Sequence, residues 1–328
     1  MSLIEVDNVS KDYIIYKNQN GVLNNIKGMF KRDKKVFKAI KDINFNVEKG
    51  EAVAYIGPNG AGKSTTIKIL SGILQPTCGS VKICDIEPYN KRRQHAKNIG
   101  VIFGQRSQLW WDIPAIDSLN LLSYMYKIDR DTYNKRIKDF DDFLEFGDFI
   151  NKPVRQLSLG ERMRIDFAAA LIHSPDILLL DEPTIGMDVV AKDRVREFVK
   201  WINAEKHVTV LLTSHDMQDI QEICNRVIMI DKGTIHYDGT MELFCKKHQK
   251  KRFINIELQN LKEANIVKEK FDVIKENDNI ITIVIDNTCS VKEVLFAIND
   301  LVDIKDISVQ NESIEEIVRN VFVENSNS

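Results

Sequence analysis

Runs of consecutive apolar residues recur along the first 240 residues and predict buried strands. They are VAYIG from Val53, NIGVIFG from Asn98, DILLLD from Asp176 and VTVLLTS from Val208. Continuous apolar runs of strand length are typical of a parallel sheet that is covered on both faces. Stretches with apolar residues at helical spacing, such as AKDRVREFVKWINAE from Ala191, separate them. This alternation of strands and helices predicts an α/β fold.

The pattern changes twice along the chain. From about 105 to 172 it turns helical, with 3.6-residue apolar spacing in LNLLSYMYKI and RIKDFDDFLEFGDFI. Residues 241–251 are basic and predict a linker. Residues 252–328 then predict strands and helices in the order β-α-β-β-α-β with a closing helix, a small ferredoxin-like α+β domain.

Composition limits the functions that fit this chain. The 328 residues carry a formal net charge of −2, so no nucleic-acid partner is expected, because nucleic-acid binders are usually strongly basic. No apolar stretch approaches the roughly 20 residues that span a bilayer, and MSLIEVDNVSKDY does not resemble a signal peptide. The five cysteines lack CxxC pairing, which is typical of a cytosolic protein. Any membrane role is therefore expected to depend on a partner.

One segment fits the pattern G-x-x-x-x-G-K-[ST], in which glycines allow backbone N–H groups to surround phosphates. The apolar run VAYIG leads into this segment. Its last residues begin STTIKILSG, a stretch that is compatible with a helix. Lys63 is predicted to reach the β- and γ-phosphates of ATP, and the Ser64 hydroxyl to ligate Mg²⁺. The residues of this loop are Gly57, Pro58, Asn59, Gly60, Ala61, Gly62, Lys63, Ser64 and Thr65.

A second segment, LLLDEP, ends an apolar strand with Asp181 and Glu182. There one carboxylate can hold a metal ion and the next can act on water. The two segments together predict that the chain binds and hydrolyses a nucleoside triphosphate.

A third segment, LSLGERMRIDFAAALIHSPDILLLDEP, places Ser158 and Gly160 at the start of a long amphipathic helix. With it, the chain resembles the nucleotide-binding subunit of an ATP-binding cassette (ABC) transporter, whose signature is LSGGQ. The resemblance covers roughly residues 1–240. It implies a P-loop NTPase with a RecA-like core, an antiparallel β-subdomain and the helical subdomain at about 105–172.

The resemblance also implies roles for single residues. Ser64 and Asp181 would hold Mg²⁺ directly or through water, and Glu182 would be the general base that polarises the attacking water. His215, at the end of VTVLLTSHD, would contact the γ-phosphate. Gln105, after IGVIFG, would sense Mg²⁺ and the water.

In this family's arrangement Ser158 and Gly160 cannot reach the phosphates of their own loop and close on ATP held by a second subunit. The resemblance therefore implies a working dimer of such domains. Leu159 and Glu161 depart from the signature, but neither removes the serine hydroxyl or the close-approach glycine. Asp188 is either the residue of the loop that communicates between the two sites or an N-cap for the following helix.

An aromatic side chain is expected to stack on adenine. Tyr13 lies where family members place this aromatic, whereas Phe37 is nearer to the phosphate loop in the sequence. Each is also compatible with a core position at the end of a strand.

Adjacent Trp110 and Trp111 cannot both face one core from a regular strand, since neighbouring side chains alternate between faces. In transporters this region receives a short cytoplasmic helix of the membrane subunit. The pair therefore indicates either a partner groove with an aromatic anchor or packing inside the helical subdomain.

The segments FGQRSQLWWD, RQLSLGERMR and DEPTIGMD most resemble ATPases of type-2 exporters that carry a C-terminal accessory domain. The resemblance implies a peripheral subunit at the cytoplasmic face of the membrane, bound to separate integral membrane permease subunits. An exporter ATPase for polysaccharide or teichoic-acid precursors is one alternative. A soluble ABC ATPase of translation or DNA repair is the other, and the single phosphate loop and the lack of a long coiled coil argue against it.

Residues from about 17 to 36 form a polar, basic insertion. Between residues 17 and 41 eight Lys and Arg residues accompany a single acidic residue, Asp33. Apolar residues from 22 to 30 recur at spacings that share one helical face. The insertion therefore predicts either a short amphipathic helix on the anionic leaflet or the membrane partner, or a solvated loop.

Overall fold

The computed structural model describes residues 2–16, 34–104, 106–259, 264–277 and 279–327. The chain divides into two compact units, Met1–Met241 and Glu242–Ser328, and each is described by itself. The expected amphipathic segment at residues 22–30 lies outside the described residues, as does Gln105.

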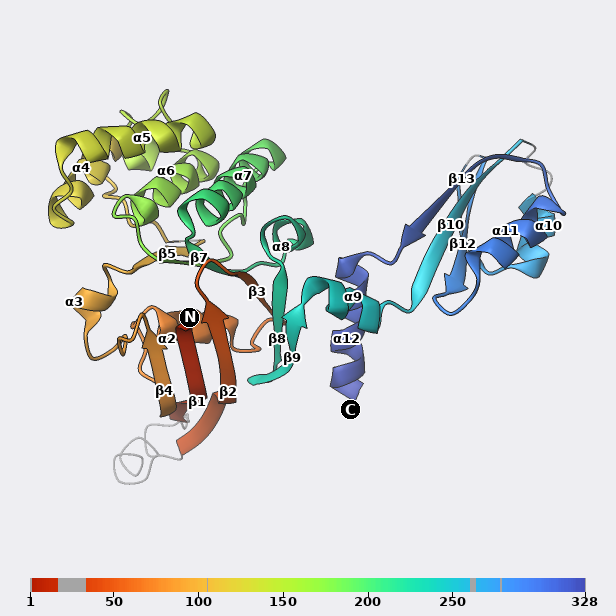
Figure 1. Ribbon diagram of the computed structural model, residues 1–328, viewed down its shortest axis with the longest axis horizontal. Helices are drawn as coiled ribbons and strands as arrows, with labels where there is room; N and C mark the ends of the chain where they lie inside the picture. The colour runs from red at the N-terminus through yellow and green to blue at the C-terminus, as the bar shows by residue number, and fades with distance from the viewer. Residues whose placement is uncertain (1, 17–33, 105, 260–263, 278, 328) are drawn as a thin grey trace, which may run out of the picture. The chain divides into compact units, whose positions relative to one another are not determined.

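A six-stranded sheet in the order β5-β6-β7-β3-β8-β9 forms the centre of the first unit (Figure 1). Its strands are β3 (Ala52–Ile56), β5 (Ile99–Phe103), β6 (Ile177–Asp181), β7 (Thr209–Thr213), β8 (Arg226–Asp231) and β9 (Thr234–Thr240). All neighbours from β5 to β8 pair in parallel, and β9 pairs antiparallel with β8. The carboxyl ends of β5, β6 and β7 lie in register, because Phe103 pairs with Asp181 and Asp181 with Thr213.

This sheet is buried as its continuous apolar runs predict. Every residue of β3 and β7 is buried, and Tyr55, Leu179 and Leu211 belong to one hydrophobic core. Helix α2 (Lys63–Leu70) contacts β6, and α6 (Leu159–Leu171) contacts β5. The remaining helices of the core are α3 (Arg92–His95), α7 (Val189–Lys206) and α8 (Met217–Ile223).

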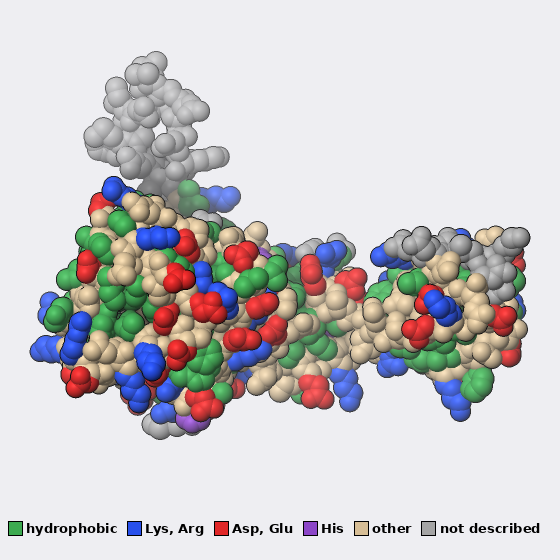
Figure 2. Space-filling model, turned by 90° about the horizontal axis from the view of Figure 1, so that it is seen from above, with side chains coloured by type: hydrophobic (Ala, Val, Ile, Leu, Met, Phe, Trp, Pro, Cys, Tyr) green, Lys and Arg blue, Asp and Glu red, His purple; other side chains and the backbone are tan. Residues whose placement is uncertain are grey.

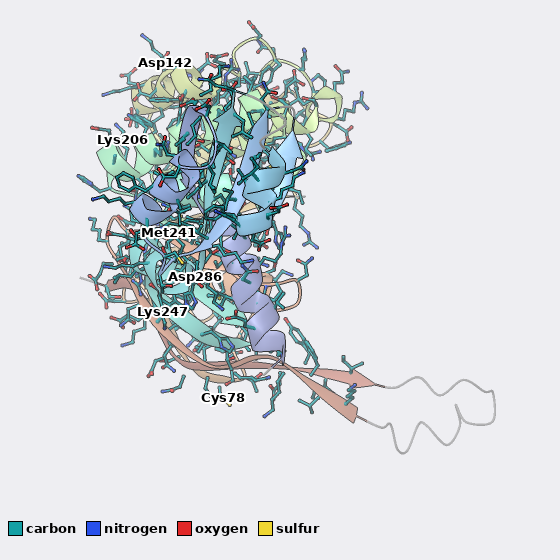
Figure 3. The ribbon with its side chains drawn as sticks, turned by 90° about the vertical axis from the view of Figure 1, so that its right-hand side faces the viewer. Cys78, Asp142, Lys206, Met241, Lys247 and Asp286 are labelled. Atoms are coloured by element: carbon teal, nitrogen blue, oxygen red, sulfur yellow. The ribbon has the colours of Figure 1, made fainter. Side chains whose placement is uncertain are left out.

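An antiparallel three-stranded sheet, in the order β2-β1-β4, makes the β-subdomain. Its strands are β1 (Ser2–Tyr16), β2 (Lys34–Glu48) and β4 (Cys78–Ile83). The pairing of β1 with β2 continues to Tyr16 and Lys34, and the two ribbons run on beyond the rest of this sheet in Figure 3. The insertion predicted at about residues 17–36 therefore extends too far, because β2 begins at Lys34. Residues 34–36 are strand because each pairs with a residue of β1, Lys34 with Tyr16, Lys35 with Ile15 and Val36 with Ile14.

The helical subdomain contains α4 (Ala115–Met125), α5 (Arg130–Leu144), the 3₁₀ turn η1 (Val154–Gln156) and α6. Asp129 begins α5 as its N-cap, accepting a hydrogen bond from the Thr132 backbone N–H. Phe140 of α5 meets Phe198 of α7 edge-on, with ring centroids 5.4 Å apart. This aromatic contact joins the subdomain to the core.

The second unit has a four-stranded antiparallel sheet in the order β11-β12-β10-β13. Its elements are α9 (Met241–His248), β10 (Lys251–Leu258), α10 (Ala264–Lys270), β11 (Val273–Asn277), β12 (Ile280–Asp286), α11 (Val291–Asn299), β13 (Ile304–Asn311) and α12 (Ile314–Asn327). From β10 to β13 this is the β-α-β-β-α-β order of a ferredoxin-like module. Its core is separate from that of the first unit and includes Ile254, Ile256, Ile283 and Ile298.

The sequence predicted a linker at residues 241–251. This prediction is wrong, because most of these residues form helix α9. Its basic residues lie in the last turn, where cations favour a helix C-terminus. Phe244 is the buried residue of this helix, and its side chain is 0% exposed. Figure 3 labels Met241 and Lys247 near the two ends of this helix.

Acidic and basic side chains are interspersed over the face of each unit that Figure 2 shows. In the described parts of the chain, every helix is too short or too polar to cross a membrane.

A chain that ends after Met241 is expected to fold and to keep its affinity for ATP, because the first unit contains the whole nucleotide pocket described below. Binding of a fluorescent ATP analogue and circular dichroism measure the two properties. A chain that ends after Lys250 is the comparison. It retains α9 without the rest of the second unit and should bind ATP equally well, because it adds no described residue that lines the pocket. A folded Met241 truncate that no longer binds ATP would contradict the division.

Candidate functional site

The phosphate loop connects β3 to α2, and its glycines cannot be replaced without strain. Gly60 and Gly62 have φ values of 82° and 117°, which L-residues rarely adopt. At Gly57 a Cβ atom would lie 2.2 Å from the carbonyl oxygen of Ile230. No side chain caps α2 at Gly62, so the N–H groups of its first turn are available to an anion.

The side chain of Lys63 folds back over this loop. It is 7% exposed, and its Nζ donates hydrogen bonds to the carbonyl oxygens of Gly57 at 2.6 Å and Pro58 at 3.3 Å. Burial lowers the pKa of Lys63, whereas the charges of Glu182 and Asp181 oppose this change. The ammonium group is thus held at the loop by acceptors that a phosphate oxygen can replace.

Asp181 ends β6 beside the start of α2. Its Oδ1 accepts hydrogen bonds from Ser64 Oγ at 3.2 Å and Thr213 Oγ1 at 2.7 Å. Mg²⁺ prefers hard oxygen ligands and is usually held by one or two carboxylates together with phosphate oxygens and water. The Ser64–Asp181 pair fits this donor set. Phosphate and water would complete the shell, since the described residues offer no group of three or more His, Cys, Asp or Glu side chains.

Glu182 and His215 lie against each other at the carboxyl ends of β6 and β7. Glu182 has a φ of 55°, and its N–H donates to the Thr213 carbonyl at 2.9 Å. Glu182 Oε2 accepts a hydrogen bond from the His215 backbone N–H at 3.1 Å. Its Oε1 lies 3.3 Å from His215 Nε2 and is buried without a hydrogen-bond partner among the described residues.

Burial raises the pKa of Glu182, while His215 and Lys63 oppose this rise. A carboxylate with a raised pKa and an unused oxygen is suited to accept a proton from water.

A cavity of about 270 Å³ joins these groups. Lys63, Ser64, Glu182 and His215 line it together with most of the phosphate loop. Both aromatic candidates line it as well, because Tyr13 and Phe37 are paired residues on β1 and β2. The two alternatives from the sequence therefore belong to one wall of one cavity.

A second cavity, of about 310 Å³, borders the same carboxylates and is lined by Ser64, Asp181, Glu182 and Arg106. The segment that precedes Gln105 is hydrogen-bonded to the end of β6 beside this cavity, because the Gly104 N–H donates to the Asp181 carbonyl oxygen at 2.8 Å. A metal- and water-sensing role for Gln105 stays a prediction.

Ser158, Gly160 and Asp188 line neither cavity. Ser158 is the N-cap of α6 and forms a capping box with Glu161. Asp188 is the N-cap of α7 and accepts a hydrogen bond from the Ala191 N–H at 2.9 Å. A Cβ atom on Gly160 would lie 3.8 Å from Asp188 Oδ2, so these two loops are neighbours outside the pocket of their own chain.

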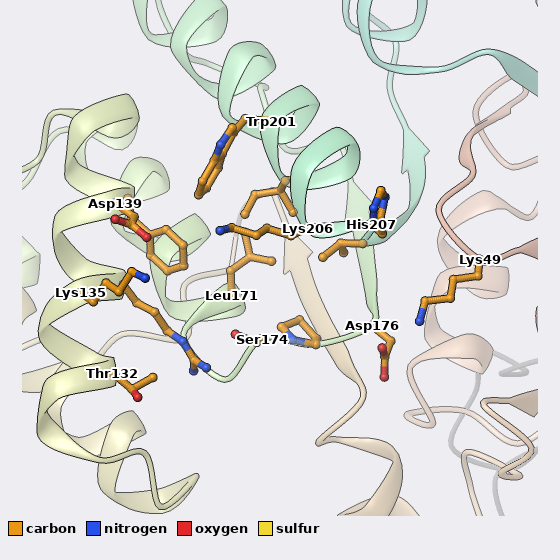
Figure 4. A pocket seen from close by; sticks show the side chains of 15 residues that line it. Lys49, Thr132, Lys135, Asp139, Leu171, Ser174, Asp176, Trp201, Lys206 and His207 are labelled. Carbon is orange, nitrogen blue, oxygen red and sulfur yellow. The ribbon is translucent and has the colours of Figure 1, made fainter.

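A larger cavity, of about 560 Å³, lies between α5 and the C-terminal end of α7 (Figure 4). Lys135 and Asp139 of α5 line it, with Trp201 and Lys206 of α7. No residue of the phosphate loop lines it. Lys63 and Glu182 both line the cavity of about 270 Å³ instead.

Two contributors to the site were not among the residues predicted from the sequence. Thr213 fixes Asp181, and its signal was a polar residue at the end of the apolar run VTVLLT. Gly104 leaves room for the backbone after Asp181, since a Cβ atom there would lie 2.0 Å from the Glu182 carbonyl oxygen.

Asp166 of α6 connects this helix to the segment after Gln105. It is 2% exposed, and its Oδ1 accepts hydrogen bonds from Ser107 Oγ at 2.9 Å and the Gln108 N–H at 3.1 Å. Its Oδ2 is buried without a hydrogen-bond partner among the described residues. Burial raises the pKa of Asp166 to about 6, although these two hydrogen bonds and Arg162 oppose the rise.

This carboxyl should make stability depend on pH. An acid whose pKa is raised on folding, here from 3.8 to about 6, stabilises the fold below the lower value and loses this contribution as pH rises through the higher one. Asp166→Asn removes the titration. Its free energy of unfolding relative to wild type should therefore rise between about pH 4 and about pH 7, by at most about 3 kcal/mol. Urea unfolding of both proteins measures the difference, and a difference that does not vary with pH would contradict the assignment.

Known proteins resemble the chain in sequence. Residues 40–185 match the family model described as ABC transporter. The chain is 35% identical to the ABC transporter ATP-binding protein NatA of Bacillus subtilis, over 65% of this chain and 86% of NatA. It is 30% identical to the linearmycin resistance ATP-binding protein LnrL of the same organism, over 70% of this chain and 73% of LnrL. It is 35% identical to the methionine import ATP-binding protein MetN 2 of Enterococcus faecalis, over 71% of this chain and 69% of MetN 2.

A solved structure resembles it as well. An ATP-binding cassette in a dimeric post-hydrolysis state, bound to ADP and Pi, matches with a TM-score of 0.60 and 26% identity. The match covers 73% of this chain and 98% of the cassette. The P-loop NTPase fold and the ATPase activity predicted from the sequence are thereby confirmed. The chain belongs to the ATP-binding proteins of ABC transporters.

Proposed function

We propose that this chain is the ATP-hydrolysing subunit of an exporter, in which ATP-driven closure of a dimer changes the conformation of separate membrane subunits. The observation that carries the dimer mechanism is the division of the predicted site. Lys63, Glu182 and His215 surround one cavity, whereas Ser158 and Gly160 lie outside it.

Around the two cavities that share Ser64 and Glu182, each side chain would have a distinct task. Lys63 would exchange its carbonyl acceptors for β- and γ-phosphate oxygens and neutralise their charge. Ser64 and Asp181 would hold Mg²⁺, which screens the phosphate charge when bound. Glu182 Oε1 would take a proton from the water whose oxygen attacks the γ-phosphorus as the bond to the β-γ bridging oxygen breaks. The His215 side chain would contact the γ-phosphate, while the His215 backbone N–H keeps the Glu182 carboxylate in place.

A second cassette would complete the site. The Ser158 hydroxyl accepts the Glu161 N–H and caps α6. The N-terminus of α6 adds the positive end of the helix dipole. We infer that this end closes on ATP held by the partner cassette, with Asp188 alongside it.

Adenine would stack on the wall formed by Tyr13 and Phe37. Tyr13→Ala is expected to weaken ATP binding by about 1–3 kcal/mol, the usual contribution of one aromatic stacked on a base. Phe37→Ala should have a smaller effect, because Phe37 is 48% exposed. Titration with ATP and with inorganic triphosphate separates the two contributions, since only the adenine-containing ligand should lose affinity. Equal losses for both ligands would show that the aromatic wall supports the phosphate loop instead.

The exposed tryptophans mark a surface for the membrane partner. Trp110 and Trp111 are 42% and 53% exposed, and the guanidinium of Arg162 lies 5.5 Å from the Trp111 ring centroid. Exposed aromatics next to an arginine are typical of contact hot spots. This surface would place the chain at the cytoplasmic face of the membrane.

Export is favoured by the segments that resemble type-2 exporters and by a relative named for Nod factor export, whereas the relatives also include a methionine import protein. An exporter of polysaccharide or teichoic-acid precursors is the second candidate, because such ATPases also carry N-terminal insertions and C-terminal domains.

Co-expression with candidate integral membrane permease subunits tests the proposal. A stoichiometric complex should be recovered from detergent-solubilised membranes, and Trp111→Ala should weaken it while ATP binding of the isolated chain is unchanged. In inside-out vesicles ATP should drive substrate into the lumen if the complex exports. ATP-driven uptake in right-side-out vesicles loaded with ATP would indicate import instead.

A further inference from the structure

A buried carboxylate behind the catalytic residues joins three segments of the first unit. Asp219, in α8, is 0% exposed. Its Oδ2 accepts hydrogen bonds from Thr184 Oγ1 at 2.5 Å and Ser214 Oγ at 3.0 Å. Its Oδ1 accepts one from Arg196 Nε at 2.7 Å.

Each partner of Asp219 belongs to a segment with a role in the site. Thr184 lies two residues after Glu182, and Ser214 immediately precedes His215. Arg196 lies in α7, the helix that Asp188 caps. Asp219 therefore connects the loop after Glu182 and the loop that carries His215 to α7, the helix that begins after Asp188.

Arg196 extends the connection and is itself buried, with 1% exposure. Its guanidinium donates to Asp193 Oδ1 at 2.8 Å and to Asp216 Oδ2 at 3.3 Å. Asp216 is the residue after His215 and the N-cap of α8. The Arg196 guanidinium thus binds Asp216 and the Asp219 carboxylate binds Ser214, so the residues before and after His215 are both held.

We propose that Asp219 and Arg196 are positioning residues that fix the distance between Glu182 and His215 and transmit movement of the Asp188 loop to this pair. Neither residue lines the nucleotide cavity, so they act through Thr184, Ser214 and Asp216. The inference rests on the catalytic roles proposed for Glu182 and His215. Closure of a second cassette on Asp188 would then move α7, and the network would carry this movement to both catalytic side chains.

Thr184→Val gives the sharpest test, because it keeps the shape of the side chain and removes only the hydroxyl that binds Asp219. We expect kcat to fall by roughly ten- to a hundredfold, as for a misplaced catalytic group, while the Kd for ATP stays unchanged. Thr184→Ser restores the hydroxyl and should restore kcat. Ser214→Ala should lower kcat in the same direction through the other hydrogen bond.

Thr209→Val is the matched control. Thr209 lies at the opposite end of β7, is 0% exposed and binds the Gly50 N–H through its hydroxyl at 2.9 Å. Both valine variants should lose thermal stability, but only Thr184→Val should lose kcat, measured well below the Tm of each protein. If Thr184→Val hydrolyses ATP as fast as Thr209→Val, the positioning role is overturned.

The outcome is separable from a failure of the proposed function. If Glu182→Gln abolishes turnover and Thr184→Val does not change it, the base is assigned correctly and the network alone is refuted. If Glu182→Gln retains turnover, the catalytic assignment itself fails.

Discussion

Replacing Glu182 with glutamine is expected to lower kcat for ATP hydrolysis by about 10²- to 10⁴-fold, the usual contribution of a general base. Glutamine keeps the size of the side chain and can still accept the His215 N–H through its carbonyl oxygen. It cannot take a proton from water. Because Lys63, Ser64 and the aromatic wall are unchanged, the Kd for ATP should stay close to that of wild type.

The same variant should accumulate as an ATP-bound dimer, since closure needs nucleotide and reopening needs hydrolysis. Phosphate release measures turnover, and size-exclusion chromatography with ATP and Mg²⁺ measures the dimer. Glu205→Gln, an exposed glutamate of α7, is the matched control and should behave as wild type. Substantial turnover by Glu182→Gln would disprove its role as the base.

Gly104→Ala is expected to lower kcat by about a hundredfold without preventing ATP binding. The new Cβ atom would lie 2.0 Å from the Glu182 carbonyl oxygen, so the backbone that carries the base has to move. A displacement of about 1 Å at a reacting group can reduce the rate by that amount. Gly104 does not line the cavity with the phosphate loop, which is why affinity should survive.

Gly239→Ala is the control for the glycine substitution itself. Its Cβ atom would lie 2.7 Å from the hydroxyl of Tyr237, so this side chain has to turn and give up its hydrogen bond to the Thr240 carbonyl oxygen, whereas no backbone of the site has to move. Steady-state kinetics and ATP titration of both variants test the argument. If Gly104→Ala has the same kcat as Gly239→Ala, the backbone accommodates the new Cβ atom without displacing Glu182, and the prediction is wrong.

The phosphate loop and the acidic strand end were predictable because each is a contiguous segment with one geometry. A parallel sheet brings its carboxyl ends to one edge, so Asp181 and the residues after Thr213 had to meet there. Lys63 and Ser64 follow from the loop alone. For these residues sequence order determines position in space.

Contacts made through tertiary packing could not be read in this way. Asp219 looks in the sequence like any acid of an amphipathic helix, and only the fold brings Thr184, Ser214 and Arg196 to it. The pairing of Tyr13 with Phe37 depends on the register of β1 and β2 across the insertion. Residues 241–251 resembled a linker because they are rich in basic residues, whereas the fold places Lys246 and Lys247 in the last turn of α9 and buries Phe244.

The separate core of the second unit has a consequence for how such chains are built and rebuilt. Ile254, Ile256, Ile283 and Ile298 pack within residues 242–328, so a recombination junction after codon 241 divides the gene without cutting through either hydrophobic core. An accessory module of this kind can be exchanged among related ATPases as one piece of DNA. None of the described residues that line the nucleotide cavity lies in this module, so phosphate chemistry places no direct constraint on its sequence.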